Sequence, residues 1–356
     1  MKKLILTAAA AMMVLASCTK TTVESIDGPK EIAFKKIEGA MTKETVEIEK
    51  DLAGNTTMGV FAFNNGTTQV YFSNTKFTLN GEGTGWAGGK YWPLNGDALD
   101  FVVYAPYIPT PDSDGKNDIA LSSRTLTFTI KESTDVSSKQ LDYLYGEEYY
   151  DSTDSGTDGD DGYNKGSNNV SVNLKHALAK ITVKASANAN GTYTIRSLSI
   201  NDVPQTGTIV VTYNDDNHAT KQDLVESVDC TPATDQVVTK TYTYNNSTPL
   251  TTTAAELGSC FAFPGNTPTT LTITYTMAGH KDGSGKDIIM YSTIDLSPND
   301  DGEWLSGNNY IYTLNLNATE ILFTPKVIIL NDVEQGSTNV EQGTTVVEPS
   351  TTVETE

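Results

Sequence analysis

The chain has 356 residues, which is enough for two domains with sizeable cores. It carries 24 Lys and Arg residues against 45 Asp and Glu residues, a formal net charge of −21. This balance argues against nucleic acid as a partner, because no basic surface offsets phosphate repulsion. It favours an exported protein that its charge keeps soluble.

The first 17 residues have the composition of a signal peptide. Two lysines precede an apolar stretch, residues 4–15, that is too short to span a bilayer as a stable helix. Ala16 and Ser17 then precede Cys18, and Leu-Ala-Ser-Cys resembles the bacterial lipobox, in which the cysteine thiol is lipidated before a peptidase cuts in front of it. Acyl chains such as palmitate stabilise membrane binding by about 0.8 kcal/mol per buried CH₂. We expect lipidation at Cys18, an outer membrane precursor and no later membrane span; an ordinary secretion signal is the alternative.

The segment after the signal contains a strand-like piece, EIAFKKIEGAM, residues 31–41. Ile32 and Phe34 share one face of it. The alternation slips at Lys35-Lys36, so that Ile37 lies on the opposite face. A β-bulge there or a short strand explains the slip.

Later segments show almost no helical periodicity. Short runs rich in Val, Ile, Thr, Tyr and Phe alternate with Gly, Asn, Asp and Pro. In TLTITYTM, one face carries Leu271, Ile273, Tyr275 and Met277 while threonines occupy the other, which is typical of a half-buried strand. The predicted strands are residues 58–63, 99–107, 124–130, 180–185, 192–200, 207–213, 270–277, 288–296 and 310–317. Many short strands favour an all-β fold of two tandem β-sandwich domains, transthyretin-like or Greek-key in kind.

An acidic, Gly- and Ser-rich stretch at residues 151–169 indicates a solvated loop near the boundary of these domains. We place the domains at residues 44–168 and 169–336. In this loop, Asp154, Asp158, Asp160 and Asp161 offer oxygen ligands, but their spacing does not match an EF-hand. Three scattered histidines and the absence of CxxC pairs argue against zinc, so we expect no metal and no cofactor.

Two cysteines remain besides Cys18. Export permits a disulfide between Cys230 and Cys260, and two separate buried thiols are equally allowed.

Several segments together resemble the fimbrillin family, the pilus subunits of Bacteroidales also called type V pilins. The resemblance lies in YWPLNGDALDFVVYAPY (91–107), NLKHALAKITVKA (173–185) and WLSGNNYIYTLNLNATEILFTPKVI (304–328), with the lipobox before them. The chain departs from the family pattern after the last strand, where it runs VIILNDVEQG without a tryptophan. From the residues alone, Trp92, Tyr104, Tyr310 and Tyr312 need only be core, and His176 a hydrogen-bonded structural residue.

The resemblance implies a processing route. Fimbrillins are exported as lipoproteins, a trypsin-like protease removes the N-terminal segment with the first strand, and a strand from another subunit fills the groove. Here residues 18–43 correspond to the propeptide, Lys43 to the cleavage site, and Ile32, Phe34 and Ile37 to the groove-filling side chains. Lys43 lies two residues beyond the end of the strand-like piece at Met41; the alternative is an ordinary surface lysine.

The tail, residues 337–356, has few large apolar side chains, so by itself it should be disordered or weakly extended. Val340, Thr344 and Val346 share one face and make it a candidate donor strand. That face is less apolar than a groove-filling strand should be. Without a donor, the protein would suit a tip or anchor position better than the shaft.

Two other functions compete with an adhesive fimbrial subunit at the cell surface. A tethered lipoprotein could bind a glycan or host ligand, with Trp86, Tyr91 and Trp92 stacking on sugar rings; the same aromatics suit a turn packed on a core. An enzyme is the weaker alternative, because no nucleophile elbow, HExxH motif or phosphate-binding loop occurs.

Overall fold

The fold comes from a computed structural model that describes part of the chain. The described residues are 28–35, 57–80, 85–110, 117–130, 135–136, 139–140, 142–148, 163–166, 169–188, 191–213, 225–233, 237–243, 248–265, 269–296, 303–317, 321–329, 339–341 and 345–347. Their regular elements are all β-strands, which confirms the predicted all-β class for this part of the chain. Nowhere in these ranges is there a helix with the length and apolar character that a membrane crossing requires.

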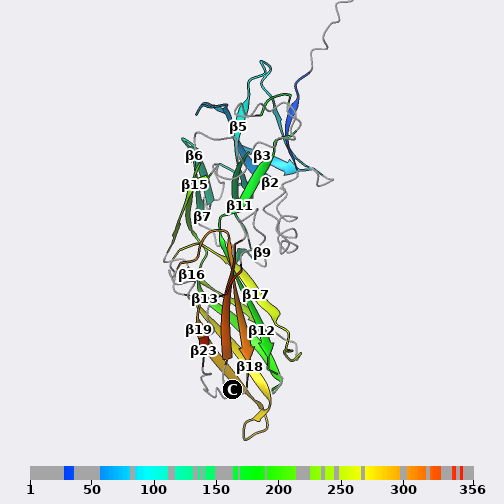
Figure 1. Cartoon of the computed structure of the whole chain (residues 1–356), viewed down its shortest axis with the longest axis vertical. Coiled ribbons are helices and arrows are strands. Elements are labelled where there is room, and N and C mark those ends of the chain that lie inside the picture. The colour runs from blue at the N-terminus through cyan, green and yellow to red at the C-terminus, as the bar shows by residue number, and fades with distance from the viewer. Residues whose placement is uncertain are drawn as a thin grey trace, which may run out of the picture.

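A seven-stranded sheet forms one end of the molecule (Figure 1). In order across the sheet, its strands are β1 (Glu31–Lys35), β4 (Gly85–Tyr91), β3 (Val70–Leu79), β2 (Thr57–Asn64), β5 (Leu99–Ala105), β10 (Leu144–Glu148) and β11 (Val172–His176). Each neighbouring pair is antiparallel. Val170, two residues before β11, forms a parallel bridge to Phe34 on β1. The two outer strands are therefore joined, and the sheet closes on itself.

The closed sheet encloses an apolar cluster, which we call the first core. Its buried members are Ile32, Phe34, Met58, Val60, Ala62, Phe72, Phe77, Trp86, Trp92, Leu99, Phe101, Val103, Ala105, Leu144, Tyr163, Val170, Val172 and Leu174. Alternate residues of β2 and β5 point to the other face, so both strands are buried on two sides. This explains why MGVFAF and LDFVVYA read as continuous apolar runs.

A four-stranded sheet covers that outer face. Its strands are β15 (Val225–Pro232), β14 (Gly207–Tyr213), β7 (Thr125–Ile130) and β6 (Asn117–Ser122). The apolar side chains between the two sheets form the middle core. Its buried members are Phe61, Phe63, Val102, Tyr104, Ile108, Ile119, Leu126, Phe128, Ile130, Tyr143, Tyr145, Ala177, Leu178, Ile209, Val211, Tyr213, Phe261 and Phe263.

The other end of the molecule is a pair of facing sheets (Figure 1). One contains β17 (Ala255–Ala262), β12 (Ala179–Ala187), β20 (Asn308–Leu316), β21 (Ile321–Ile329) and the short strands β22 (Asn339–Glu341) and β23 (Thr345–Val347), both on β21. The second contains β16 (Val237–Thr243), β13 (Tyr193–Pro204), β18 (Thr270–Lys281) and β19 (Asp287–Asp295). A separate two-stranded sheet joins β8 (Asp135–Val136) to β9 (Lys139–Gln140).

Between the facing sheets lies the third core. It contains the predicted face of β18, with Leu271, Ile273 and Tyr275 buried, and the predicted core tyrosines Tyr310 and Tyr312. The remaining buried members are Ala179, Ile181, Val183, Ala185, Ala187, Tyr193, Ile195, Leu198, Ile200, Val203, Cys260, Ala262, Ile294, Leu296, Trp304, Leu314 and Leu316. The alternation of TLTITYTM thus identified a strand and its buried face correctly.

Strand pairing does not follow the chain in two consecutive blocks. β14 and β15 come after residue 169, yet β14 pairs with β7 over six residue pairs, from Gly207–Ile130 to Thr212–Thr125. β11 likewise follows residue 169 and pairs with β10. The chain therefore enters the β12 sheet, returns to the β7 sheet and goes back again.

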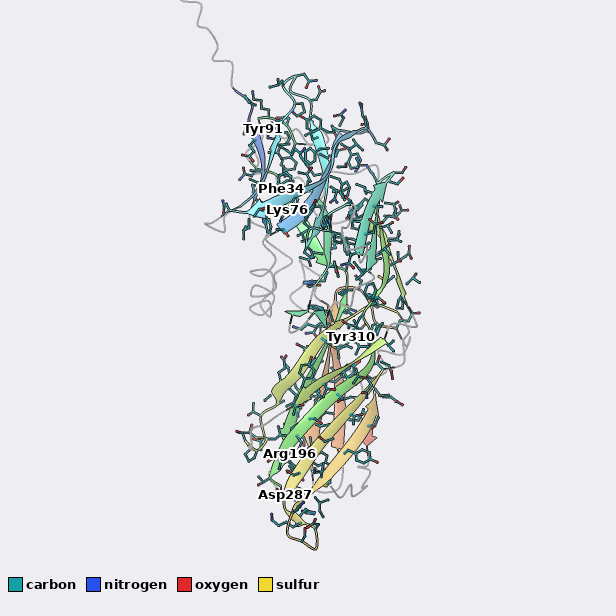
Figure 2. The ribbon with its side chains drawn as sticks, turned by 180° about the vertical axis from the view of Figure 1, so that it is seen from behind. Phe34, Lys76, Tyr91, Arg196, Asp287 and Tyr310 are labelled. Carbon is teal, nitrogen blue, oxygen red and sulfur yellow. The ribbon has the colours of Figure 1, made fainter. Side chains whose placement is uncertain are left out.

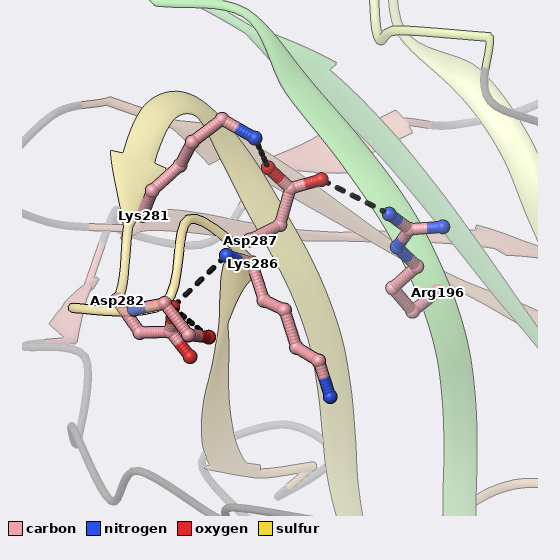
Figure 3. Close-up of polar contacts among 6 residues, drawn as sticks. Arg196, Lys281, Asp282, Lys286 and Asp287 are labelled. Carbon is pink, nitrogen blue, oxygen red and sulfur yellow. Dashed lines mark hydrogen bonds and ion pairs between the residues drawn. The ribbon is translucent and has the colours of Figure 1, made fainter.

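A tight turn joins β18 to β19 at the far end of the molecule (Figures 1 and 3). The Asp282 carboxylate accepts hydrogen bonds from the backbone N–H groups of Ser284 (2.8 Å) and Lys286 (2.9 Å) and from the Ser284 hydroxyl (2.7 Å). These bonds lower the pKa of Asp282, the Ser284 hydroxyl contributing most. Asp287 pairs with Lys281 at 3.0 Å and lies 3.8 Å from Arg196.

Candidate functional site: the slot of the first strand

The first strand lies in a slot between two other segments. On one side, β1 pairs antiparallel with β4, with Ala33 opposite Ala87 and Phe34 opposite Trp86. On the other, the Val170 N–H donates to the Ala33 carbonyl and the Lys35 N–H donates to the Val170 carbonyl, both at 2.9 Å. β1 is therefore an interior strand of the closed sheet, and its removal would expose hydrogen-bonding groups on both neighbours.

Two side chains of β1 fill the interior. Ile32 and Phe34 are both fully buried in the first core. The Phe34 ring meets Phe77 edge-on at 5.2 Å and Phe101 at 5.3 Å between ring centroids. Burial of side chains of this size stabilises a fold by about 1.5–3 kcal/mol each. The sequence-based prediction that Ile32 and Phe34 share one buried face agrees with this placement.

The neighbouring strand is shaped to accept β1. Gly85 lies opposite Lys35, and a Cβ at this glycine would lie 2.8 Å from the Phe34 carbonyl oxygen. Between Glu31 and Ala33 the register shifts, and Gly89 on β4 has a φ of +65°. The Glu31 carboxylate accepts the Gly89 N–H at 2.9 Å. This register shift lies at Ile32. The slip expected at Lys35-Lys36 stays a prediction, because Lys36 and Ile37 lie outside the described residues.

The start of β1 is fixed as well. The Lys30 carbonyl accepts the Trp92 N–H at 3.0 Å, and the Lys30 ammonium donates to the Lys165 carbonyl at 3.0 Å. Figure 2 labels Phe34 and Tyr91 in the same end of the molecule. Backbone bonds to β4 on one side and to Val170 on the other, together with burial in the first core, therefore hold β1 in place.

Several predicted site residues lie outside the described residues. They are Cys18, Ile37, Lys43 and Thr344, as is most of the acidic loop at 151–169. The two described donor candidates lie on the edge of β21: Val340 is in β22 opposite Val327, and Val346 is in β23 opposite Leu322. This places the described tail strands in the half that contains Tyr310, away from Phe34 (Figure 2).

The aromatic residues considered for sugar stacking divide into two groups. Trp86 and Trp92 are buried in the first core, where Trp92 meets Phe101 at 5.8 Å. Tyr91 is exposed. Two of the three side chains are therefore core residues and offer no face to a sugar.

The cysteines and His176 have structural surroundings. No disulfide joins Cys230 to Cys260, which lie in different cores: Cys230 packs against the middle core and Cys260 lies in the third. Of the two alternatives left open by the sequence, the structure has separate thiols. His176 Nδ1 lies 2.6 Å from a carboxylate oxygen of Asp142, and both side chains are buried. Across the described ranges, no three His, Cys, Asp or Glu side chains gather as a metal site would require.

Comparison with known proteins shows the family to which most of the chain is similar. The fimbrillin-like family matches residues 42–331. The fimbrium subunit Fim1C of Phocaeicola vulgatus is 23% identical over 141 residues, which are 35% of this chain and 37% of that protein. The match therefore covers little more than a third of the length of this curated relative.

Solved structures with a similar course of the chain were also found. A candidate cell adhesion protein from Bacteroides uniformis is 16% identical, with a TM-score of 0.49 over 85% of this chain and 98% of that one. A fimbrial protein from Bacteroides vulgatus is 16% identical, with a TM-score of 0.46 over 88% of this chain and 99% of that one.

Proposed function

Because the chain belongs to the fimbrillin-like family, we propose that it is a structural subunit of a cell-surface fimbrium, exported as a lipoprotein and assembled by strand exchange. In this proposal, Cys18 carries the lipid, a trypsin-like protease cuts after Lys43, and β1 leaves with the propeptide. A strand from a second copy or another fimbrial subunit then fills the slot. The role is structural and adhesive, with no catalytic step.

One observation carries the proposal: β1 is bonded on both sides and fills the first core with Ile32 and Phe34. Its loss would leave apolar side chains and two rows of backbone groups facing water. A strand from another subunit restores both through β-augmentation. A cut after Lys43 would separate β1 from the rest of the chain, so that the strand dissociates as part of one peptide.

The tail is the proposed donor. β22 and β23 pair with β21 through the backbone, so these segments already adopt extended conformations that a groove accepts. Donation requires them to leave β21. Because β1 and the tail strands lie in opposite halves (Figure 2), exchange between subunits would connect the end of one molecule to the start of the next.

We also propose that the fold comprises two β-sandwich domains. The division is supported by the three cores, of which the first and middle lie at one end and the third at the other. β11, β14 and β15 would then belong to the first domain although they follow residue 169.

The test is limited trypsin treatment of residues 19–356 followed by analysis of assembly. We expect release of a peptide ending at Lys43 and then a ladder of oligomers that resists mild detergent. The Lys43→Gln variant should resist this cut and remain monomeric. A cut protein that stays monomeric at high concentration would contradict strand exchange.

A peptide of residues 28–41 sharpens the test. Added to the cut protein, it should reoccupy the slot and suppress the ladder. A matched peptide with Phe34→Asp should fail to do so, because it would place a charge among Phe77 and Phe101. Equal inhibition by both peptides would show that assembly does not depend on this slot.

A further inference from the structure

Within the described ranges, exposed large apolar side chains gather mainly at one place. Val70 (53% exposed), Tyr71 (41%), Tyr91 (48%) and Leu94 (80%) lie near the start of β1, and we call them the tip surface. Across the described ranges, the other exposed large apolar side chains are Ile289 and Leu305. Isolated exposed side chains are ordinary, whereas a cluster of them marks an interaction site.

Hydrogen bonds bring the tip surface together. The Tyr71 hydroxyl donates to the Tyr91 carbonyl at 3.0 Å, which links the start of β3 to the end of β4. Leu94 follows in a turn in which the Gly96 N–H donates to the Pro93 carbonyl at 3.3 Å. The neighbouring turn after β2 is joined to this segment through the Asn65 N–H and the Ala98 carbonyl at 3.1 Å.

The N-terminal segment leads into β1 beside these residues. The Lys30 carbonyl accepts the Trp92 N–H, so residues 28–30 run next to the segment that carries Tyr91 and Leu94. Ten residue steps separate Cys18 from Gly28. Fully extended, they reach at most about 35 Å. A lipid on Cys18 would therefore keep the tip surface close to the bilayer.

The charge at this end also differs from that of the chain. Residues 28–31, 64–71, 89–98 and 163–166 contain three lysines, Lys30, Lys90 and Lys165, and two carboxylates, Glu31 and Asp97. The whole chain has a net charge of −21. Among these described residues, the end that faces the tether is thus not acidic, and an anionic lipid surface would repel them less than it would repel the rest of the molecule.

We propose that the tip surface contacts the lipid bilayer while the precursor is tethered, with Leu94 and the Tyr71 and Tyr91 rings entering the headgroup region. Tyrosine suits this position, because its ring is apolar and its hydroxyl remains hydrated. The contact would orient the precursor with β1 toward the membrane and β18–β19 away from it. This inference rests on the lipid tether of the proposed function.

The test measures whether Leu94 enters lipid. Residues 19–356 with an N-terminal histidine tag are tethered to vesicles of phosphatidylethanolamine and phosphatidylglycerol that contain a nickel-chelating lipid. A Leu94→Cys variant carries an environment-sensitive NBD label. Ile289→Cys is the matched control, because Ile289 is 53% exposed and lies two residues from Asp287 at the opposite end (Figure 2). The parent chain gives the background labelling of Cys230 and Cys260, which are shielded in the cores.

On tethering, we expect the label at position 94 to shift to the blue, to gain intensity severalfold and to be quenched by brominated acyl chains. The label at position 289 should keep its emission in water. Tyr71→Ser with Tyr91→Ser should at least halve the response at position 94. Equal responses at the two positions, or an unchanged emission at position 94, would overturn the inference.

The two proposals can fail separately. A ladder after trypsin treatment with a label at position 94 that remains in water would overturn the membrane contact alone. Because the histidine tag replaces the lipid, a blue shift at position 94 would support the tip surface even if Cys18 proved unmodified in cells, a result that would contradict the tether.

Discussion

At the residue scale, a buried ion pair joins Asp100 to Arg124. Asp100 is buried within β5, in the apolar run LDFVVYA, and its carboxylate lies 2.7 Å from the Arg124 guanidinium and 3.0 Å from the Gly66 N–H. Ser123 and Arg124 form the two-residue turn between β6 and β7, with φ of 48° and 59°. Left-handed backbone costs about 1–2 kcal/mol per non-glycine residue. The turn therefore keeps two residues at unfavourable positive φ angles, and this conformation directs the Arg124 side chain toward Asp100.

Arg124→Ala should lower the free energy of unfolding by about 3–5 kcal/mol, because it leaves a buried carboxylate without its cation. Urea unfolding followed by tryptophan fluorescence measures the change. Ser123→Gly in the same turn serves as control and should be neutral or stabilising by about 1 kcal/mol. A loss below about 1 kcal/mol for Arg124→Ala would show that the pair contributes little.

Because of the Cys230 thiol, the free energy of unfolding should depend on pH in the alkaline range. Burial, with a smaller contribution from the nearby Asp229 charge, raises the pKa of this thiol from 9.0 to about 12. Below pH 9 the thiol is neutral in both states, so its contribution is fully present. Above pH 9 the unfolded chain loses the proton first, and stability falls as the pH rises toward 12. Burial also raises the pKa of Tyr145, from 10.0 to about 12, so tyrosine effects begin later.

Between pH 9 and pH 10, Cys230→Ala should therefore lose less stability than the parent, by at most about 1 kcal/mol. Urea midpoints at the two pH values give the difference. Cys230→Ala and the parent should show the same change between pH 7 and pH 8. Parallel curves across the whole range would mean that the thiol titrates at its ordinary pKa.

At the scale of elements, hydrogen bonds in the β18–β19 turn limit how easily a protease can cut at the two lysines that flank it. Lys281 and Lys286 flank the β18–β19 turn, where the Asp282 carboxylate binds two backbone N–H groups and Asp287 pairs with Lys281 (Figure 3). A protease requires an extended segment, and loop tips are otherwise its preferred sites. The turn contacts oppose that extension.

We expect limited trypsin treatment to spare Lys281 and Lys286 in the parent chain, and Asp282→Ala to create a new cut there at a severalfold higher rate. Mass spectrometry of the fragments identifies the site. Glu226→Ala, which removes the same charge from exposed β15, is the control and should leave the pattern unchanged. Rapid cutting of the parent at this turn would show that the capping contacts do not protect it.

How far the sequence predicts these elements depends on the range of the interactions. Alternation found the faces of β1 and β18, since Ile32, Phe34 and Ile273 follow period two. The buried pairs Asp100–Arg124 and Asp142–His176 were not predicted, because their members are 24 and 34 residues apart and share no local pattern. A charge within the apolar run of β5 was the available signal for Asp100.

At the scale of the whole molecule, long-range pairing is the part that no local pattern reveals. GTIVVTY was recognised as a strand, but its partner β7 lies about 80 residues earlier, across the proposed boundary at residue 169. The middle core also receives Phe261 and Phe263 from the end of β17 and the residue after it. Backbone bonds reinforce this junction, from the Ala177 N–H to the Tyr143 carbonyl (2.7 Å) and from the Gly307 N–H to the Leu178 carbonyl (3.0 Å).

These contacts predict that the chain cannot be divided at residue 169 into two stable parts. A fragment of residues 19–168 lacks β11, β14 and β15 and would expose Leu126 and Phe128. Alone, it should bind hydrophobic dyes and give poorly dispersed NMR spectra. Refolded together with residues 169–356, it should recover native dispersion, because β14 can again pair with β7.

The matched control for this experiment is the same mixture with Val211→Asp. Val211 lies on β14 opposite Leu126 and is fully buried in the middle core, so a carboxylate there should prevent recombination. Thr212→Asp, one residue further along the same strand, points out of that core and should permit it. If residues 19–168 instead gave a dispersed spectrum without its partner, the pairing of β7 with β14 would be dispensable, and the first sandwich would be complete before the chain reaches residue 169.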